Sequence, residues 1–89
     1  MSKLFLGNIP NSFSDNDIAQ WVESFGFPVV SVEIIKDRAT GVPRGFGFVR
    51  LSEEGRLGDA VRLLHGELMG GRVITANEAN PLNGIRRAS

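Results

Sequence analysis

The segment Arg44-Gly45-Phe46-Gly47-Phe48-Val49-Arg50-Leu51 decides the fold, because its side chains alternate in character like those of a half-buried β-strand. Successive side chains of a strand point to opposite faces of a sheet, so one face carries only glycine and aliphatic residues. The other face carries two arginines and two phenylalanines, and arginines are too costly to bury without partners. We therefore predict that Phe46 and Phe48 lie on an open sheet face, between Arg44 and Arg50.

A strand near the N-terminus extends this open face. Residues 3–8 alternate in the same way, which directs Leu4 and Leu6 toward the core. Lys3 and Phe5 then share the open face with the two phenylalanines of the first segment. A cluster of exposed aromatic rings flanked by cations indicates a surface that a ligand covers. Nucleobases are the expected ligand, since each base can stack on an aromatic ring for about 1 to 3 kcal/mol.

The rest of the chain predicts two helices and two more strands. Apolar residues recur at helical spacing between Ser14 and Gly26 and again between Ser52 and Gly66, and each serine is the expected N-cap. The predicted strands cover residues 3–8, 29–36, 44–51 and 72–78. The order βαββαβ indicates an α+β, ferredoxin-like sandwich, in which two helices pack on one face of a four-stranded antiparallel sheet.

The strand over residues 29–36 has its own predicted inner and outer sets. Val30, Val32 and Ile34 form the inner set. Glu33 belongs to the outer set, on the open face, where its carboxylate would repel phosphate.

The composition fits one intracellular domain. The chain has 89 residues, of which 42% are hydrophobic and 22% charged, as in ordinary globular domains. It contains no cysteine, which excludes disulfides and thiolate metal sites, and its first residues lack the apolar core of a secretory signal. We expect an intracellular, cytoplasmic protein without membrane association, and leave a nuclear location open.

The formal net charge is zero, which argues against an affinity that comes mainly from neutralising phosphates. The charges are unevenly distributed, however. Most acidic residues fall on or beside the predicted helices, whereas most lysines and arginines fall on strands, loops and the C-terminal tail. The surface is therefore expected to be positive over the sheet and negative behind it.

The sequence also resembles a known family. Residues 44–51 are similar to the octamer signature of RNA-recognition motifs, and Leu4-Phe5-Leu6-Gly7-Asn8-Ile9 is similar to the companion hexamer. The chain looks most like the small stand-alone RNA-binding proteins of bacteria and the glycine-rich RNA-binding proteins of plants. The resemblance implies an RNA-recognition motif domain over residues 1–80, followed by a flexible C-terminal tail over residues 81–89.

The resemblance further implies a site for single-stranded RNA on the open face. Single-stranded DNA would bind as well unless contacts to the 2′-hydroxyl discriminate. Leu51 replaces an aromatic residue of the octamer, but alternation directs it into the core. Contacts from the last strand would come from Thr75 and Asn77, and from Asn80 just after it. The complete expected site comprises Phe5, Phe46, Phe48, Arg44, Lys3, Arg50, Lys36, Arg38, Asn77 and Thr75.

Other interpretations of the same fold stay open. A protein-interaction module would grip a peptide or a second subunit through its helices or its sheet, and a homodimer joined through the sheets would hide the aromatic rings. The tail, with Leu82 and Ile85, could also fold back over them. No nucleophile with a histidine partner is evident, and His65 lacks a second metal-ligating histidine or cysteine, so we expect no enzyme activity, cofactor or metal.

Overall fold

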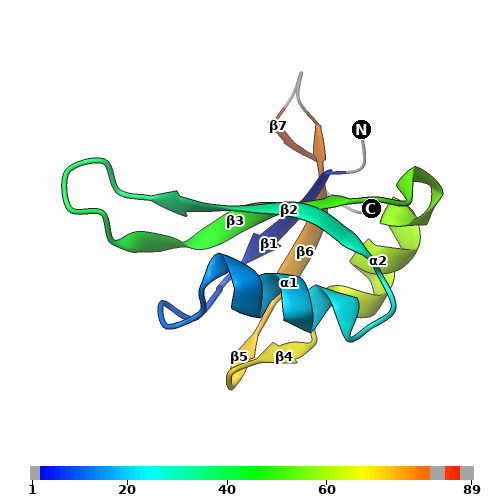
Figure 1. Ribbon diagram of the computed structural model, residues 1–89, viewed down its shortest axis with the longest axis horizontal. Coiled ribbons are helices and arrows are strands. Elements are labelled where there is room, and N and C mark those ends of the chain that lie inside the picture. The colour runs from blue at the N-terminus through cyan, green and yellow to red at the C-terminus, as the bar shows by residue number, and fades with distance from the viewer. Residues whose placement is uncertain (1–2, 81–83, 87–89) are drawn as a thin grey trace.

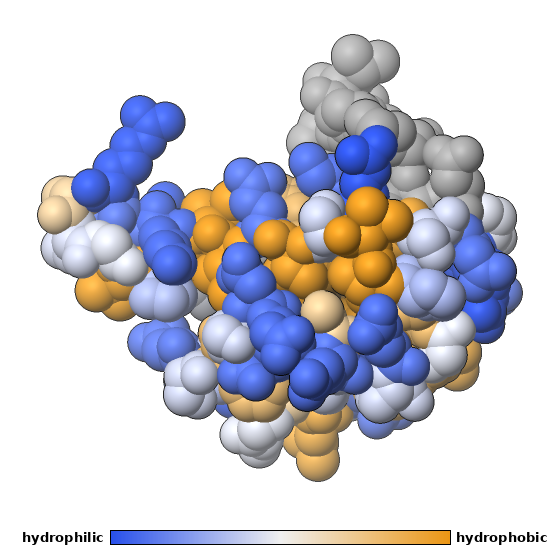
Figure 2. Space-filling model, in the orientation of Figure 1, coloured by the Kyte–Doolittle hydropathy of each residue, from blue (hydrophilic) through white to orange (hydrophobic). Residues whose placement is uncertain are grey.

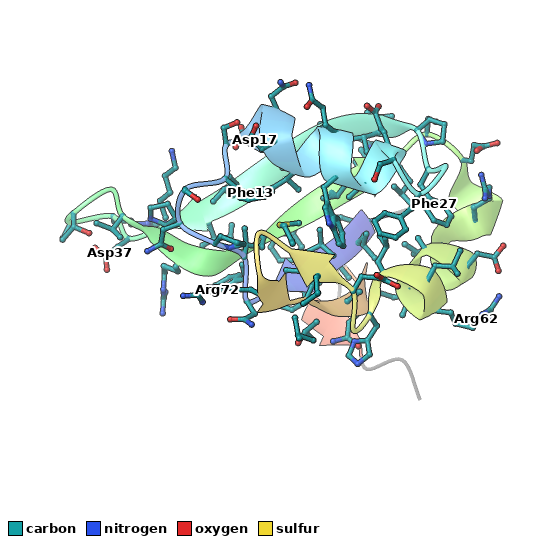
Figure 3. All side chains as sticks on the ribbon, turned by 90° about the horizontal axis from the view of Figure 1, so that it is seen from below. Phe13, Asp17, Phe27, Asp37, Arg62 and Arg72 are labelled. Atoms are coloured by element: carbon teal, nitrogen blue, oxygen red, sulfur yellow. The ribbon has the colours of Figure 1, made fainter. Side chains whose placement is uncertain are left out.

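The computed structural model describes residues 3–80 and 84–86 of the chain. Its elements are, in order, β1 (Lys3–Gly7), α1 (Asp15–Glu23), β2 (Val29–Lys36), β3 (Pro43–Leu51), the 3-10 turn η1 (Glu54–Arg56), α2 (Leu57–Leu64), β4 (Leu68–Met69), β5 (Arg72–Val73), β6 (Thr75–Asn80) and β7 (Gly84–Arg86). Both helices lie on the same side of the sheet (Figure 1). Figure 3 shows this covered side, with the helices and the β4–β5 hairpin in front of the sheet.

The strands run in the order β2-β3-β1-β6-β7, so β3 and β1 are central. All of their pairings are antiparallel. The four predicted strands therefore form the sheet in the predicted βαββαβ connection, with β6 as the last of the four. The fold class is confirmed.

The core lies between the helices and the inner face of the sheet. Leu4 and Leu6 of β1, and Val49 and Leu51 of β3, are buried as the alternation predicted. Their counterparts on the helices are Ile18, Val22, Ala60, Val61 and Leu64. Both helices pack on this one face of the sheet, so neither of them covers the opposite face.

The first helix begins as the sequence predicted. Ser14 is its N-cap, and the Ser14 hydroxyl accepts a hydrogen bond from the backbone N–H of Asp17 at 3.1 Å. The Asp17 carboxylate accepts in turn from the Ser14 N–H at 3.0 Å, which completes a capping box. Two of the free N–H groups at the helix start are thereby satisfied.

The start of the second helix was predicted wrongly. Ser52 does not cap α2: its hydroxyl donates to the Pro28 carbonyl at 3.4 Å, and the η1 turn intervenes before the helix begins. The N-cap is Arg56, which makes no side-chain cap and instead donates from Nη1 to the Gly26 carbonyl at 2.8 Å. The Arg56 guanidinium also lies 4.5 Å from the centre of the Phe27 ring. A tertiary contact therefore positions this helix where local capping does not.

The inner set of β2 also differs from the prediction. Val30 is 60% exposed, whereas Val32 and Ile34 pack against the core. The pairing with β3 shifts between Val29 and Ser31, so Val30 is an extra residue of a β-bulge. A bulge changes which face a residue occupies, and simple alternation does not reveal it.

The C-terminal part of the fold has two features that the sequence did not predict. The expected strand over residues 72–78 is split into β5 and β6, because β5 pairs with β4 in a separate hairpin. Residues 84–86, within the segment expected to be a flexible tail, form β7 and pair with β6 along the edge of the sheet. The possibility that Leu82 and Ile85 fold back over the aromatic rings concerns side chains that lie outside what the structure describes. Within residues 3–80 and 84–86, no helix is both long and apolar enough to cross a membrane.

Candidate nucleic-acid interface

The sheet face opposite the helices carries a row of four side chains in direct register. Glu33 of β2 lies opposite Phe48 of β3, Phe48 lies opposite Phe5 of β1, and Phe5 lies opposite Asn77 of β6. Directly opposed residues of antiparallel strands point to the same face. The structure therefore brings together residues that are far apart in the sequence. Figure 2 shows apolar side chains at the surface above β2 and β3, with hydrophilic ones around them.

Three phenylalanine rings form the centre of this face, as predicted. The centre of the Phe5 ring lies 5.9 Å from that of Phe46 and 5.9 Å from that of Phe48. All three side chains are half-buried, and none of them belongs to the partly buried apolar residues that pack against the core. Phe5 packs against both other rings, and all three lie outside the core, so the rings are accessible to a ligand. We call this group the aromatic cluster.

The close approach of β2 to β3 requires glycine beside the aromatic cluster. A Cβ atom at Gly47 would lie 2.6 Å from the Glu33 carbonyl oxygen and 3.1 Å from the Ile34 Cα. Both of these are backbone atoms that cannot rotate away. The glycine between the two phenylalanines of β3 therefore has a packing role, and it does not form a phosphate-binding loop.

Two cations of the predicted site lie against the aromatic cluster. The Lys3 Nζ is 5.2 Å from the centre of the Phe48 ring, and the Arg44 Cζ is 5.7 Å from the centre of the Phe46 ring. Both distances suit cation–π attraction. Arg50 is exposed and lies opposite Lys3 in the register, so it extends the positive charge along the same face.

Lys36 and Arg38 lie at the β2–β3 hairpin, which projects beyond the rest of the molecule at the left of Figure 1. Both side chains are exposed. The loop is held by Asp37, whose Oδ1 accepts from the N–H groups of Ala39 at 2.8 Å and Thr40 at 3.1 Å. Lys36 and Arg38 therefore lie at the margin of the sheet face, away from the aromatic cluster. There they can contact a ligand that extends beyond the cluster.

The predicted polar residues of the last strand lie on the same face. Thr75 is exposed and pairs with Gly7, and Asn77 is half-buried beside Phe5. The side chain of Asn80 lies outside what the structure describes. The site predicted from sequence thus gathers on one face, with the hairpin pair at its margin.

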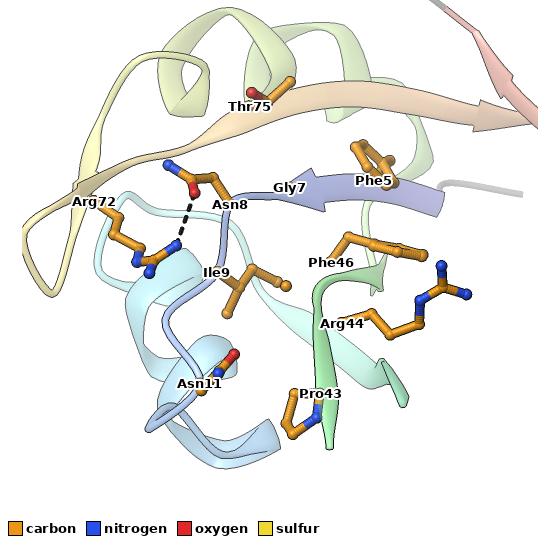
Figure 4. A pocket seen from close by; sticks show the side chains of 11 residues that line it. Phe5, Gly7, Asn8, Ile9, Asn11, Pro43, Arg44, Phe46, Arg72 and Thr75 are labelled. Carbon is orange, nitrogen blue, oxygen red and sulfur yellow. Dashed lines mark hydrogen bonds between the residues drawn. The ribbon is translucent and has the colours of Figure 1, made fainter. Parts of the chain in front are cut away.

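An open depression of about 610 Å³ continues the aromatic cluster beyond the end of β1. Figure 4 shows Phe5 and Phe46 on one side of it and Asn8 and Arg72 on the other. Asn8 has a φ of 65°, and its amide donates to the Val73 carbonyl at 2.9 Å and accepts from Arg72 Nη1 at 3.0 Å. We did not predict Asn8 or Arg72 as site residues, because their approach depends on the β4–β5 hairpin.

In the part of the chain that the structure describes, no three histidine, aspartate or glutamate side chains group as metal ligands would. His65 has a structural contact, since its Nδ1 accepts from the Ala76 N–H at 3.1 Å. The arrangement offers aromatic platforms, hydrogen-bonding groups and positive charge, which suit binding.

Comparison with known proteins yields relatives whose names describe RNA-binding proteins and ribonucleoproteins. Glycine-rich RNA-binding protein 8 of Arabidopsis thaliana is 39% identical over 77 residues, which cover 86% of this chain and 45% of that protein. The chloroplastic 31 kDa ribonucleoprotein of Nicotiana sylvestris is also 39% identical over 77 residues, covering 86% of this chain and 24% of that one. The chain thus spans less than half the length of these curated relatives, and their names include a chloroplast protein, so the cytoplasmic location stays a prediction.

Solved structures agree with the fold. RNA Binding Protein PG1 superposes with a TM-score of 0.78 at 30% identity, covering 89% of this chain and 94% of that chain. The second RRM domain of the yeast poly(U)-binding protein Pub1 superposes with a TM-score of 0.76 at 26% identity, covering 91% of this chain and 96% of that chain. The family model for the RNA recognition motif matches residues 4–75. This family is not a class of enzymes. The chain belongs to the RNA recognition motif family.

Proposed function

We propose that the protein binds short single-stranded RNA by stacking bases on Phe5, Phe46 and Phe48. The observation that carries this proposal is the aromatic cluster itself: three phenylalanines on a helix-free face, with cations 5.2 Å and 5.7 Å from two of the rings. The names of the relatives, which include RNA-binding proteins and a ribonucleoprotein, support it.

Positive charge close to the rings would neutralise the phosphates of the bound strand. Lys3, Arg44 and Arg50 lie on the face, and Lys36 and Arg38 lie at the projecting hairpin. The acidic residues of the first helix lie on the other layer, Asp15 and Asp17 at its start and Glu23 at its end. A net charge of zero is therefore compatible with phosphate binding, because the electrostatic field at a site depends more on the nearby charges than on the net charge of the protein.

Thr75 and Asn77 would supply hydrogen bonds to base edges or ribose. Each lies opposite a residue of β1 on the open face, within reach of a nucleotide that stacks on Phe5. A contact to the ribose 2′-hydroxyl would favour RNA over DNA. Comparison of an RNA and a DNA oligonucleotide of the same sequence measures that preference.

The test is a titration of labelled, unstructured RNA pools of about eight nucleotides with the wild type and with the double variant Phe46→Ala, Phe48→Ala. Loss of two platforms should weaken binding by roughly 2 to 6 kcal/mol, enough to abolish micromolar affinity. The matched control is Leu68→Ala, Val73→Ala, which removes two exposed apolar side chains from the β4–β5 hairpin and leaves the sheet face intact. Circular dichroism checks that each variant is folded.

A second candidate function is protein binding. Leu63 of α2 and the opposed pair Leu68 and Val73 are 53%, 61% and 56% exposed, which is much apolar surface for the covered side of a small domain. If the wild type binds no RNA at either low or moderate salt, the RNA proposal fails and this candidate becomes the leading one. Sedimentation at several protein concentrations separates a partner protein from self-association.

A further inference from the structure

Glu33 is a carboxylate placed beside the aromatic cluster. It is exposed and lies directly opposite Phe48 in the pairing of β2 with β3, and its side chain makes no hydrogen bond or ion pair within the described part of the chain. Two of the nearby cations lie over aromatic rings, Lys3 over Phe48 and Arg44 over Phe46. No contact within the fold accounts for an acidic side chain on a face that is proposed to bind phosphates, so we considered whether Glu33 contacts the ligand.

The register determines what Glu33 can reach. Cβ atoms of directly opposed residues lie about 4.5 to 5.5 Å apart, and a nucleobase is wider than that spacing. Because β2 is at the edge of the sheet, a base stacked on Phe48 has Phe5 on one side and Glu33 on the other. The Glu33 side chain is therefore within reach of one edge of that base.

A carboxylate accepts hydrogen bonds and donates none when it is ionised. Guanine offers two adjacent donors, N1–H and the 2-amino group, which match the two carboxylate oxygens. Cytosine and adenine each offer one amino group, and uracil offers one N–H between two carbonyl oxygens that a carboxylate repels. The chemistry at this position thus ranks guanine first and uracil last.

We propose that Glu33 is a specificity-determining residue, which selects guanine for the base stacked on Phe48. This inference rests on the proposed RNA binding and names the base class for one position of that site. A well-aligned bidentate contact discriminates between bases by about 5-fold to 150-fold. The sequence alone suggested a different role for Glu33, a general repulsion of phosphate, and the two roles give different results in one experiment.

The experiment measures the affinity of wild type, Glu33→Gln and Glu67→Gln for seven-nucleotide RNAs of sequence UUUXUUU, where X is G, inosine, A, C or U. Glu67 is exposed, lies between α2 and β4, and loses the same charge in its variant, so it controls for net charge. Inosine lacks the 2-amino group of guanine and keeps N1–H. We expect wild type and Glu67→Gln to bind the G oligonucleotide at least 5-fold more tightly than the U oligonucleotide, with inosine between them. We expect Glu33→Gln to reduce the G-to-U ratio to about 2-fold or less.

Two results would overturn the inference. If Glu33→Gln binds every oligonucleotide more tightly by one common factor, Glu33 repels phosphate and selects no base. If the wild type shows no preference for G over U, the carboxylate does not read the stacked base. Both results leave RNA binding itself intact, whereas absence of binding to all five oligonucleotides by the wild type would refute the proposed function instead.

Discussion

Gly7 lies beneath the ring of Phe5 on the open face of the sheet. A Cβ atom at residue 7 would be 3.2 Å from the Phe5 Cε2 and 3.3 Å from its Cζ. The missing side chain lets the Phe5 ring extend across β1 toward Phe46, whose ring centre is 5.9 Å away. The glycine thus sets the geometry of the aromatic cluster without touching a ligand.

Gly7→Ala should therefore displace the Phe5 ring and weaken RNA binding by about 1 kcal/mol, roughly fivefold, a fraction of the value of one stacked base. Stability should change little, since Gly7 does not require a positive φ. A double-mutant cycle with Phe5→Ala provides the control, because Gly7→Ala should cost nothing further once the ring is gone. An equal loss in both backgrounds would show that Gly7 acts by another route.

Arg44→Ala should weaken RNA binding by a similar factor for every sequence, because a guanidinium that neutralises a phosphate does not read a base. The slope of log K against log salt should become shallower by about 0.7, the value of one phosphate contact on a single strand. Arg62→Ala is the matched control, since Arg62 is on α2 and paired with Asp59. Equal slopes for Arg44→Ala and wild type would place Arg44 outside the phosphate contacts.

Gly47→Ala should destabilise the fold by about 1 to 3 kcal/mol, because the added methyl group would meet the backbone of β2 and force the strands apart. Gly58→Ala is the opposite case. Residue 58 lies in α2, and nothing would stand within 4 Å of its Cβ, so the substitution should stabilise the protein by about 0.5 to 1 kcal/mol. Urea denaturation measures both, and a neutral Gly47→Ala would contradict the contact at 2.6 Å.

Trp21→Phe should destabilise the protein by about 0.5 to 1.5 kcal/mol, the usual value of one hydrogen bond. The Trp21 Nε1–H donates to the Leu68 carbonyl at 2.9 Å and so attaches the β4–β5 hairpin to α1. Leu68→Ala, which keeps the backbone acceptor and removes an exposed side chain, should have little effect. Circular dichroism is the required readout, because the variant has no tryptophan and the chain has no tyrosine. Faster amide exchange in the hairpin should accompany the loss of stability.

The sequence by itself determined the order of the two helices and the four main strands, and the residues of the open face on β1 and β3. These features follow from local patterns. Alternation in β1 and β3 predicts which side chains are buried, and the Ser14 capping box predicts the start of α1. The exposed phenylalanines were predictable because arginines on the same face are costly to bury, which is a property of composition and spacing.

Tertiary structure alone decided the features that depend on contacts between distant segments. The bulge that exposes Val30 arises in the pairing of two strands, and the start of α2 depends on Arg56 reaching Gly26. The same holds for the approach of Arg72 to Asn8, which are 64 residues apart. Alternation could assign Glu33 to the open face, but only the register of β2 against β3 places its carboxylate beside Phe48. The register of two strands depends on many contacts between residues far apart in the sequence, so no single stretch of sequence reveals it.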